Sequence, residues 1–153
     1  MHLKTLFTTL SVLIIISITL GTLSLRQMDN EAREFINTTM LGLFADWNNG
    51  DFLTHTSNEL RQNLTDEELH KINLIFRRLG KLLNYHGAYG GVSTTRWHIR
   101  VRYKAQASFQ NGQFTATLTL IKRQGNWAIG RFEYQYAFFP NRRHSGSIKH
   151  AKY

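Results

Sequence analysis

The sequence predicts an α+β fold, in which a hydrophobic N-terminal helix precedes two or three helices packed on a strongly curved antiparallel sheet. Three observations predict it. An apolar run opens the chain, apolar residues then recur every three or four positions, and from Thr95 onward they alternate at every second position. Helices therefore come first and strands afterwards, as in folds whose helices gather on one face of a sheet.

Length and composition set the domain organisation. The chain has 153 residues and no cysteine, which excludes a disulfide framework, a thiolate metal site and a cysteine nucleophile. Pro140 is the single proline, which favours long regular elements. We expect a leader over residues 1–26, one α+β domain over residues 29–139, and a basic flexible tail over residues 140–153.

The leader contains an apolar run over residues 6–25, which follows Lys4 and ends at Arg26. Twenty helical residues span about 30 Å, the thickness of the hydrocarbon core of a bilayer. Its most apolar part, residues 12–20, also has the length of the central region of a cleaved signal peptide. Both interpretations stay open. Either one predicts a membrane-anchored domain that faces outside the cytoplasm, or an exported domain in the periplasm or outside the cell.

The first helix of the domain is predicted to begin at Asp29 or Asn30, either of which is a suitable N-cap. A turn over Asn48-Asn49-Gly50-Asp51 is predicted to end it. One apolar stripe connects the two ends. It consists of Ala32, Phe35, Ile36, Thr39, Met40, Leu43, Phe44 and Trp47.

A second helix is predicted to open at Thr65-Asp66-Glu67-Glu68, where Thr65 and Glu68 form a capping box. Its apolar stripe runs through Leu69, Ile72, Ile75, Phe76, Leu79, Leu82 and Leu83. Glycines at 87, 90 and 91 are then expected to break the chain. A shorter helical turn is expected over residues 53–64.

Three strands are predicted after the glycines. Residues 97–109 alternate between apolar and polar, and Asn111-Gly112 is a strong hairpin signal. A return strand over residues 114–120 and a turn at Gln124-Gly125-Asn126 follow, and a third strand rich in Phe and Tyr covers residues 127–138.

One face of the first predicted strand is strongly basic. It carries Arg96, His98, Arg100, Arg102 and Lys104, which we call the basic strand face. Side chains on one face of a strand recur at about 6.7 Å, within the screening length of about 8 Å, so they repel one another unless anions offset the charge. The face is a candidate site for an acidic protein or an anionic lipid. The alternative is a solvated outer face, partly paired with Glu133.

The charge of the whole chain is distributed unevenly. Up to His70 the chain has four Lys or Arg and nine Asp or Glu, a net charge of −5, whereas the rest has fifteen against one, a net charge of +14. This asymmetry favours contact with an anionic partner. Nucleic acid is disfavoured, because export removes that ligand and no stacking aromatic residues interleave on the basic strand face.

Three segments resemble the nuclear-transport-factor-2-like superfamily, the cystatin-like cone: residues 44–52, 103–112 and 120–129. The resemblance covers about residues 30–139, and the chain looks most similar to small exported or membrane-anchored members without an assigned activity. It implies a cone-shaped barrel, in which helices fill the mouth of a strongly bent sheet, with a pocket inside the cone. Candidate pocket residues are Trp47, Asp51, Tyr85, Trp97, Tyr103, Trp127 and Tyr134.

The leading functional hypothesis is a non-enzymatic domain that binds an anionic surface or an acidic protein through the basic strand face. A ligand-binding or acid–base pocket inside the cone is the first alternative. The second is an assembly subunit of a membrane or secretion complex, because anchored members of the superfamily occur in such machinery. No cofactor is expected, and no metal site, because Glu67 and His70 form only a single helical pair. The oligomeric state is left open.

Overall fold

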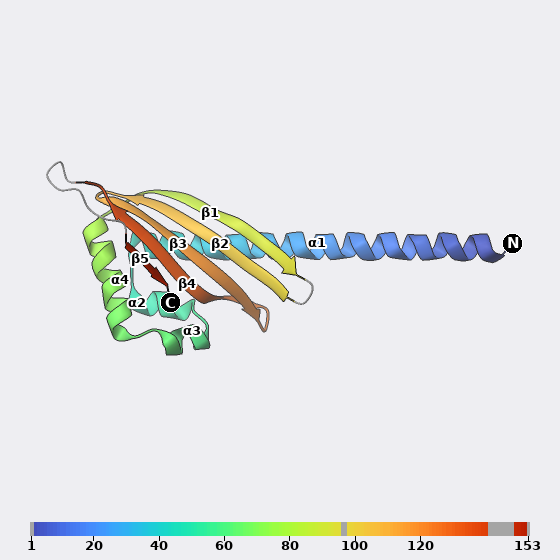
Figure 1. The fold of residues 1–153 in the computed structure, drawn as a ribbon, viewed down its shortest axis with the longest axis horizontal. Helices are drawn as coiled ribbons and strands as arrows, with labels where there is room; N and C mark the ends of the chain where they lie inside the picture. Colours follow the sequence, from blue (N-terminus) through green and yellow to red (C-terminus); the bar gives the residue numbers. More distant parts are fainter. Residues whose placement is uncertain (1, 96–97, 141–148, 153) are drawn as a thin grey trace.

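The computed structural model describes residues 2–95, 98–140 and 149–152, with side chains over residues 24–93 and 100–140. In this part of the chain four helices come first and an antiparallel sheet follows (Figure 1). The predicted α+β class, with helices before strands, is confirmed.

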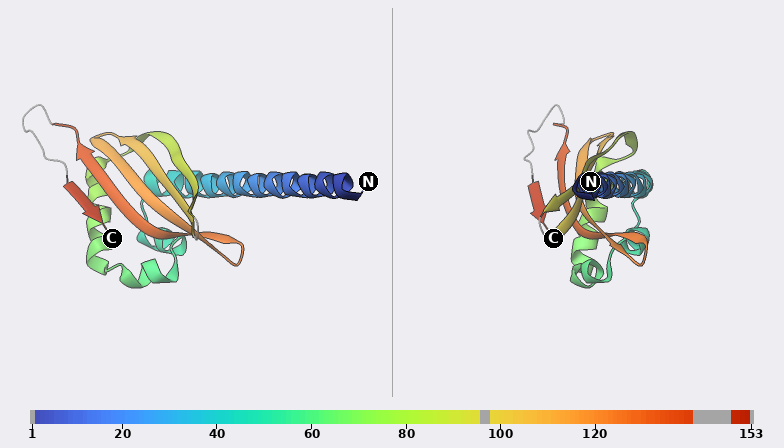
Figure 2. Two further views of the ribbon diagram at one scale, coloured as in Figure 1. Left: turned by 45° about the vertical axis from the view of Figure 1, so that its right-hand side comes forward. Right: turned by 90° about the vertical axis from the view of Figure 1, so that its right-hand side faces the viewer.

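Helix α1 runs without interruption over His2–Ala45. The prediction that a helix begins at Asp29 or Asn30 is therefore wrong, because both residues lie inside α1. The Asp29 side chain contacts the sheet instead of capping a helix end. The N-terminal half of α1 projects away from the domain in each view, whereas its C-terminal half lies along the sheet (Figures 1 and 2).

The apolar run over residues 6–25 lies almost entirely outside the residues whose side chains are described. Where side chains are described, no helix is both long enough and apolar enough to cross a membrane. The membrane anchor and the signal peptide therefore stay predictions.

Three shorter helices follow α1. They are α2 (Asn49–Thr54), α3 (Asn58–Asn63) and α4 (Asp66–Leu79). The Asn48-Asn49-Gly50-Asp51 segment begins α2, since the Asn48 side chain accepts a hydrogen bond from the Asp51 N–H at 3.2 Å. The capping box of α4 is confirmed: Thr65 Oγ1 accepts from the Glu68 N–H at 3.2 Å, and Glu68 Oε2 accepts from the Thr65 N–H at 2.8 Å.

Strand β1 (Leu82–Thr95) corrects the prediction in two ways. Helix α4 ends at Leu79 and Gly80 adopts a φ of 78°, so Leu82 and Leu83 belong to β1 and not to the helix. The glycines do not break the chain, since β1 passes through all three of them. A Cβ on Gly90 would lie 2.2 Å from the Arg102 carbonyl oxygen, so glycine is needed there for close contact with the next strand.

The three predicted strands are confirmed. They are β2 (His98–Phe109), β3 (Gly112–Arg123) and β4 (Asn126–Phe138). The β2–β3 hairpin turns through Gln110 and Asn111, one residue earlier than the predicted Asn111-Gly112 turn, because Phe109 pairs with Gly112. The β3–β4 turn has a φ of 50° at Gln124 and 84° at Gly125, the two left-handed residues of a type I′ turn.

The described strands form one open sheet in the order β1-β2-β3-β4-β5, with every neighbouring pair antiparallel. The sheet twists over the helices (Figure 1), but it does not close into the predicted barrel, because β1 and β5 are its two edges. Strand β5 (Lys149–Lys152) pairs with β4, so that part of the predicted flexible tail is a strand. Residues 141–148 lie outside the described residues.

Aromatic rings fill the space between the helices and the sheet. Phe76 of α4 stacks on Trp47 at a centroid distance of 4.6 Å, and lies 4.6 Å from Phe114 of β3. The centroid of the Phe44 ring lies 6.0 Å from that of Phe109 and 5.7 Å from that of Phe114. Alternate residues of β2 complete the core as the alternation predicts: Val101, Tyr103, Ala105, Ala107 and Phe109 are buried.

Candidate functional site

The described part of the basic strand face is on the outside of the sheet. Arg100, Arg102 and Lys104 are exposed, whereas the residues between them on β2 are buried against the helices. Alternation along a strand places them together on this face. The His98 side chain and the whole of Arg96 lie outside the described residues. Three of the five predicted positions can therefore be placed, and all three are on the outer face.

The neighbours of these cations on the adjacent strands are small, except for Tyr89. Across β1, Arg102 pairs with Gly91, Arg100 with Ser93 and Lys104 with the exposed Tyr89; across β3, Arg102 pairs with Thr119 and Lys104 with Thr117. The threonines of β3 are half-buried between the longer side chains. Arg102 therefore lies between two small residues, whereas Lys104 lies between Thr117 and the larger Tyr89.

Glu133 of β4 partly neutralises the face. Its carboxylate lies 3.2 Å from Arg102 and 3.0 Å from Arg131, and its side chain is only 16% exposed. This is the pairing with Glu133 that the alternative interpretation expects. Arg100 and Lys104 have no ion pair within the described residues. Pairing with Glu133 therefore offsets only part of the positive charge.

Arg131 belongs to the same outer surface, although the prediction does not include it. It pairs with Thr119, which in turn pairs with Arg102, so the two arginines flank one threonine. The signal in the sequence is weak but present, because Arg131 and Glu133 alternate with the buried Phe132 and Tyr134. Their position opposite β2 depends on strand register, which the sequence does not reveal.

The candidate pocket residues do not meet around one cavity. Tyr103 and Tyr134 are buried core residues, and Tyr134 stacks on Phe114 at 5.5 Å. Trp47 and Trp127 each border a different depression that is open to solvent, with volumes of about 330 and 630 Å³. Trp97 lies outside the described residues.

The other two candidates have structural contacts. Asp51 is exposed on α2 and lies 3.7 Å from His55, one helical turn later. Tyr85 is half-buried and donates its hydroxyl hydrogen to Asn37 Oδ1 at 2.9 Å. Burial raises the pKa of Tyr85 to about 12. It therefore stays protonated at neutral pH and is a poor general base.

Trp127 is the one described residue with a buried side-chain nitrogen that lacks a hydrogen-bond partner. The pKa of Glu31 is lowered, mainly by the hydrogen bond from Lys122 and least by Trp127. The Lys122 ammonium also lies over the Trp127 ring, 5.2 Å from the centroid. These contacts connect α1 to the β3–β4 hairpin rather than form a pocket.

A polar ladder, formed by Asp29, Arg33 and Asn37, fixes α1 to the exposed edge of β1, and it is not among the predicted sites. Asp29, Arg33 and Asn37 are spaced four residues apart, so they share one face of α1. Asp29 accepts from the Val92 N–H at 3.3 Å, and Asn37 accepts from the Ala88 N–H at 2.9 Å. The three side chains replace the strand partner that β1 lacks on this side.

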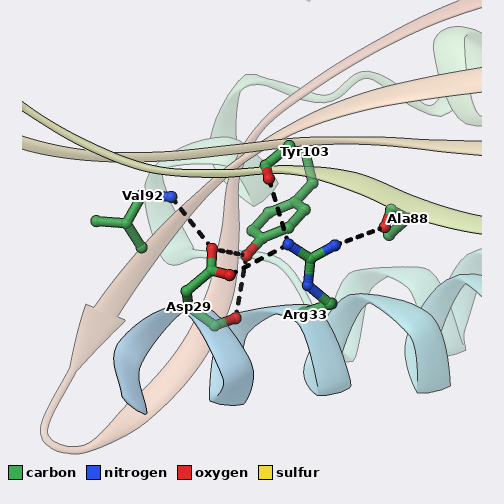
Figure 3. A network of polar contacts seen from close by, with 6 residues as sticks. Asp29, Arg33, Ala88, Val92 and Tyr103 are labelled. Carbon is green, nitrogen blue, oxygen red and sulfur yellow. Dashed lines mark hydrogen bonds and ion pairs between the residues drawn. The ribbon is translucent and has the colours of Figure 1, made fainter. Parts of the chain in front are cut away.

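Arg33 occupies the centre of the ladder (Figure 3). It donates to the carbonyl oxygens of Ala88 at 3.2 Å and Gly90 at 3.4 Å, and forms an ion pair with Asp29 at 3.1 Å. Its guanidinium also lies 5.3 Å from the centroid of the Tyr103 ring. One side chain therefore joins α1 to both β1 and β2.

Tyr103 and Asp29 complete the junction. The Tyr103 hydroxyl donates to the Asp29 carboxylate and lies 3.0 Å from the backbone carbonyl oxygen of the same residue. This hydrogen bond is the main reason that the pKa of Asp29 is lowered, and Arg33 lowers it further. Burial, and then the hydrogen bond to Asp29, raises the pKa of Tyr103. Asp29 is therefore an anion held by neutral and cationic donors, which suits a structural contact rather than proton transfer.

Neither a metal-binding cluster nor a known relative indicates a chemistry for these residues. Within the described residues, no group of three or more His, Asp or Glu side chains comes together in a way that could hold a metal ion. No protein-family model, no curated protein and no solved structure matches the chain.

Proposed function

We propose that the chain is a non-enzymatic domain, anchored to a membrane or exported by its leader, that binds carboxylate or phosphate groups through the basic strand face. The observation that carries the proposal is the pair Arg100 and Lys104, exposed on one face of β2 without an ion pair among the described residues. Arg102 and Arg131 add positive charge beside them, with Glu133 as the one described carboxylate in this group.

For the fold, we propose that the domain is a member of the nuclear-transport-factor-2-like superfamily. The order of elements and the helices gathered on one face of a twisted sheet support it. The interior does not favour the alternative of a ligand pocket, since rings from α1, α4 and β3 contact one another where the ligand of a cone would lie. The apolar run at the N-terminus supports a membrane or exported location.

The proposal is tested with the full-length protein in nanodiscs of neutral phosphatidylcholine and a fluorescent poly-aspartate peptide as the probe. The wild-type protein is expected to bind the peptide, with an affinity that falls as salt rises. The double variant Arg100→Glu/Lys104→Glu is expected to weaken binding about tenfold or more, because it reverses the two unpaired cations. Vesicles of phosphatidylglycerol form a parallel arm that tests lipid as the source of the anionic groups.

The matched control is Arg77→Glu/Lys81→Glu. It makes the same change in net charge, at exposed positions in the last turn of α4 and just beyond it. If both double variants weaken binding equally, the probe responds to net charge and not to the basic strand face. The proposed site would then be wrong.

A further inference from the structure

The outer face of the sheet and one part of the helical layer carry opposite charge. The outer face of the sheet is cationic, whereas residues 46–68, which include α2, α3 and the first turn of α4, contain six acidic residues and a single arginine. We call this part the acidic helical layer; the rest of α4 is basic, with Lys71, Arg77 and Arg78. Most of these acids are exposed: Asp46, Asp51, Glu59, Asp66 and Glu67. Because the helices cover the inner face of the sheet, the acidic and cationic surfaces lie on opposite sides of the domain.

The acidic layer keeps a negative charge after its own ion pairs are formed. Glu67 pairs with Lys71 at 2.9 Å, and Glu59 pairs with Arg123 at 2.7 Å. Both pairs are more than half exposed, so water screens them and they contribute little. Asp46 and Asp66 have no ion pair within the described residues. An external cation would therefore find unpaired carboxylates on this layer.

The position of α1 determines which way the two surfaces face. The polar ladder fixes the helix along β1, and its N-terminal half extends past one end of the domain (Figures 1 and 2). The outer face of the sheet and the helical layer both lie beside the axis of α1. A membrane around residues 6–25 would meet the end of the domain, whereas both charged surfaces would face sideways, toward a neighbouring protein.

We infer that the basic strand face of one copy binds the acidic helical layer of a second copy, head to tail. The inference rests on the proposed function and names the anionic partner as another molecule of this chain. Copies with parallel α1 helices approach one another sideways, as molecules anchored in one membrane do. Two basic strand faces repel each other, so the contact is heterologous, and it propagates into a ring or a filament.

A charge-swap experiment with full-length protein in a neutral detergent tests the inference by analytical ultracentrifugation. The first variant, Arg100→Glu/Lys104→Glu, reverses the basic strand face. The second, Asp66→Lys/Glu67→Lys, reverses the first turn of α4. Wild type is expected to form oligomers in about 20 mM salt and to dissociate at about 0.5 M, where the screening length falls to a few ångströms.

Each variant alone is expected to associate at least about tenfold more weakly than wild type, since two surfaces of like charge would meet. An equimolar mixture of the two is expected to restore association, because each charged surface again finds an opposite partner. The variant Arg77→Glu/Lys81→Glu is the control, and it is expected to assemble at least as strongly as wild type, because it leaves the basic strand face intact and adds negative charge to the helical side. Restoration by mixing also shows that both variants are folded.

Three results would overturn the inference. Wild type that stays monomeric at low salt, or variants that assemble as well as wild type, would exclude this contact. Failure of the mixture to assemble, with both variants folded by circular dichroism, would exclude it as well. If monomeric wild type still binds poly-aspartate or anionic vesicles, the proposed function stands and the partner is a different protein or lipid. If it binds neither, both proposals fail.

Discussion

The Tyr103 hydroxyl, on the inner face of β2, donates a hydrogen bond to the carboxylate of Asp29 in α1, 74 positions earlier in the chain. This hydrogen bond supplements the apolar contacts between α1 and the sheet, such as those of Phe44 with Phe109 and Phe114. Arg33, one helical turn after Asp29, contacts both partners. The stability and the pH response of the junction follow from these three side chains.

Replacing Tyr103 with phenylalanine is expected to destabilise the domain by about 1–2 kcal/mol. The substitution leaves the ring in place but removes the donor, while Asp29 keeps Arg33 and Val92 as partners. Urea unfolding followed by tryptophan fluorescence measures the change. Tyr89→Phe on the exposed side of β1 is the control and should leave the unfolding free energy unchanged. Equal effects of both substitutions would contradict the importance of this hydrogen bond.

The pH dependence of stability tests the charge on Asp29. Its pKa is lowered in the folded protein, so its contribution is complete above the unfolded pKa of about 4 and is lost as pH falls through the folded pKa. The variant Asp29→Asn is expected to be less stable than wild type at pH 6. The difference in unfolding free energy should shrink below about pH 4. A difference that is constant from pH 6 to pH 2 would show that ionisation of Asp29 does not stabilise the fold.

Two glycines are expected to respond to alanine with opposite sign. At Gly112 a Cβ would lie 2.2 Å from the Ala137 carbonyl oxygen and 2.8 Å from Leu79 Cδ2, so Gly112→Ala should cost about 2 kcal/mol or more. At Gly42, in the last turn of α1, a Cβ meets nothing within 4 Å. Gly42→Ala should stabilise the protein by about 0.5 kcal/mol, since alanine favours helix. Thermal unfolding of both variants checks the two signs.

Glu133→Gln is expected to strengthen binding of poly-aspartate about three- to tenfold. The substitution removes the carboxylate that pairs with Arg102 and Arg131, and both cations become available to the probe. Because both arginines are more than half exposed, the cost in stability should stay below about 1 kcal/mol. Titration of the labelled peptide into nanodisc-bound protein measures the affinity. Unchanged or weaker binding would place the anionic site elsewhere.

The sequence predicts the elements whose pattern is set by burial on one face. Strand β2 alternates cleanly because Tyr103 and its neighbours face the core while Arg102 and Lys104 face water. Strand β1 lacks this pattern. It is an edge strand whose free backbone groups are satisfied by α1 side chains, so it tolerates glycine and needs few apolar residues.

The limits of each helix are less predictable than the helix itself. Asp29 has the chemistry of an N-cap, yet its carboxylate finds donors in β1 and β2, far away in sequence. Leu82 continues the apolar spacing of α4, but Gly80 turns the chain one residue after Leu79. Tertiary contact overrides local preference in the first case, and backbone conformation overrides periodicity in the second.

Only part of the candidate site could be predicted, because the sequence does not reveal how neighbouring strands are aligned. Alternation places Arg100, Arg102 and Lys104 on one face without any knowledge of neighbouring strands. The positions of Arg131 and Glu133 beside them depend on the register of β3 and β4, where the pairing shifts between Thr119 and Leu120. A shift of one residue exchanges the two faces of a strand, so these neighbours are known only from the structure.

The uninterrupted course of α1 has a mechanical consequence. A domain attached by a flexible linker swivels independently of its anchor, whereas here the same helix continues from the chain's first turns to the centre of the core. Rotating the outer turns about the helix axis would rotate Arg33, and with it the β1 edge, by the same angle. The helix therefore couples its N-terminal turns to the domain, and a torque on one end would reach the other.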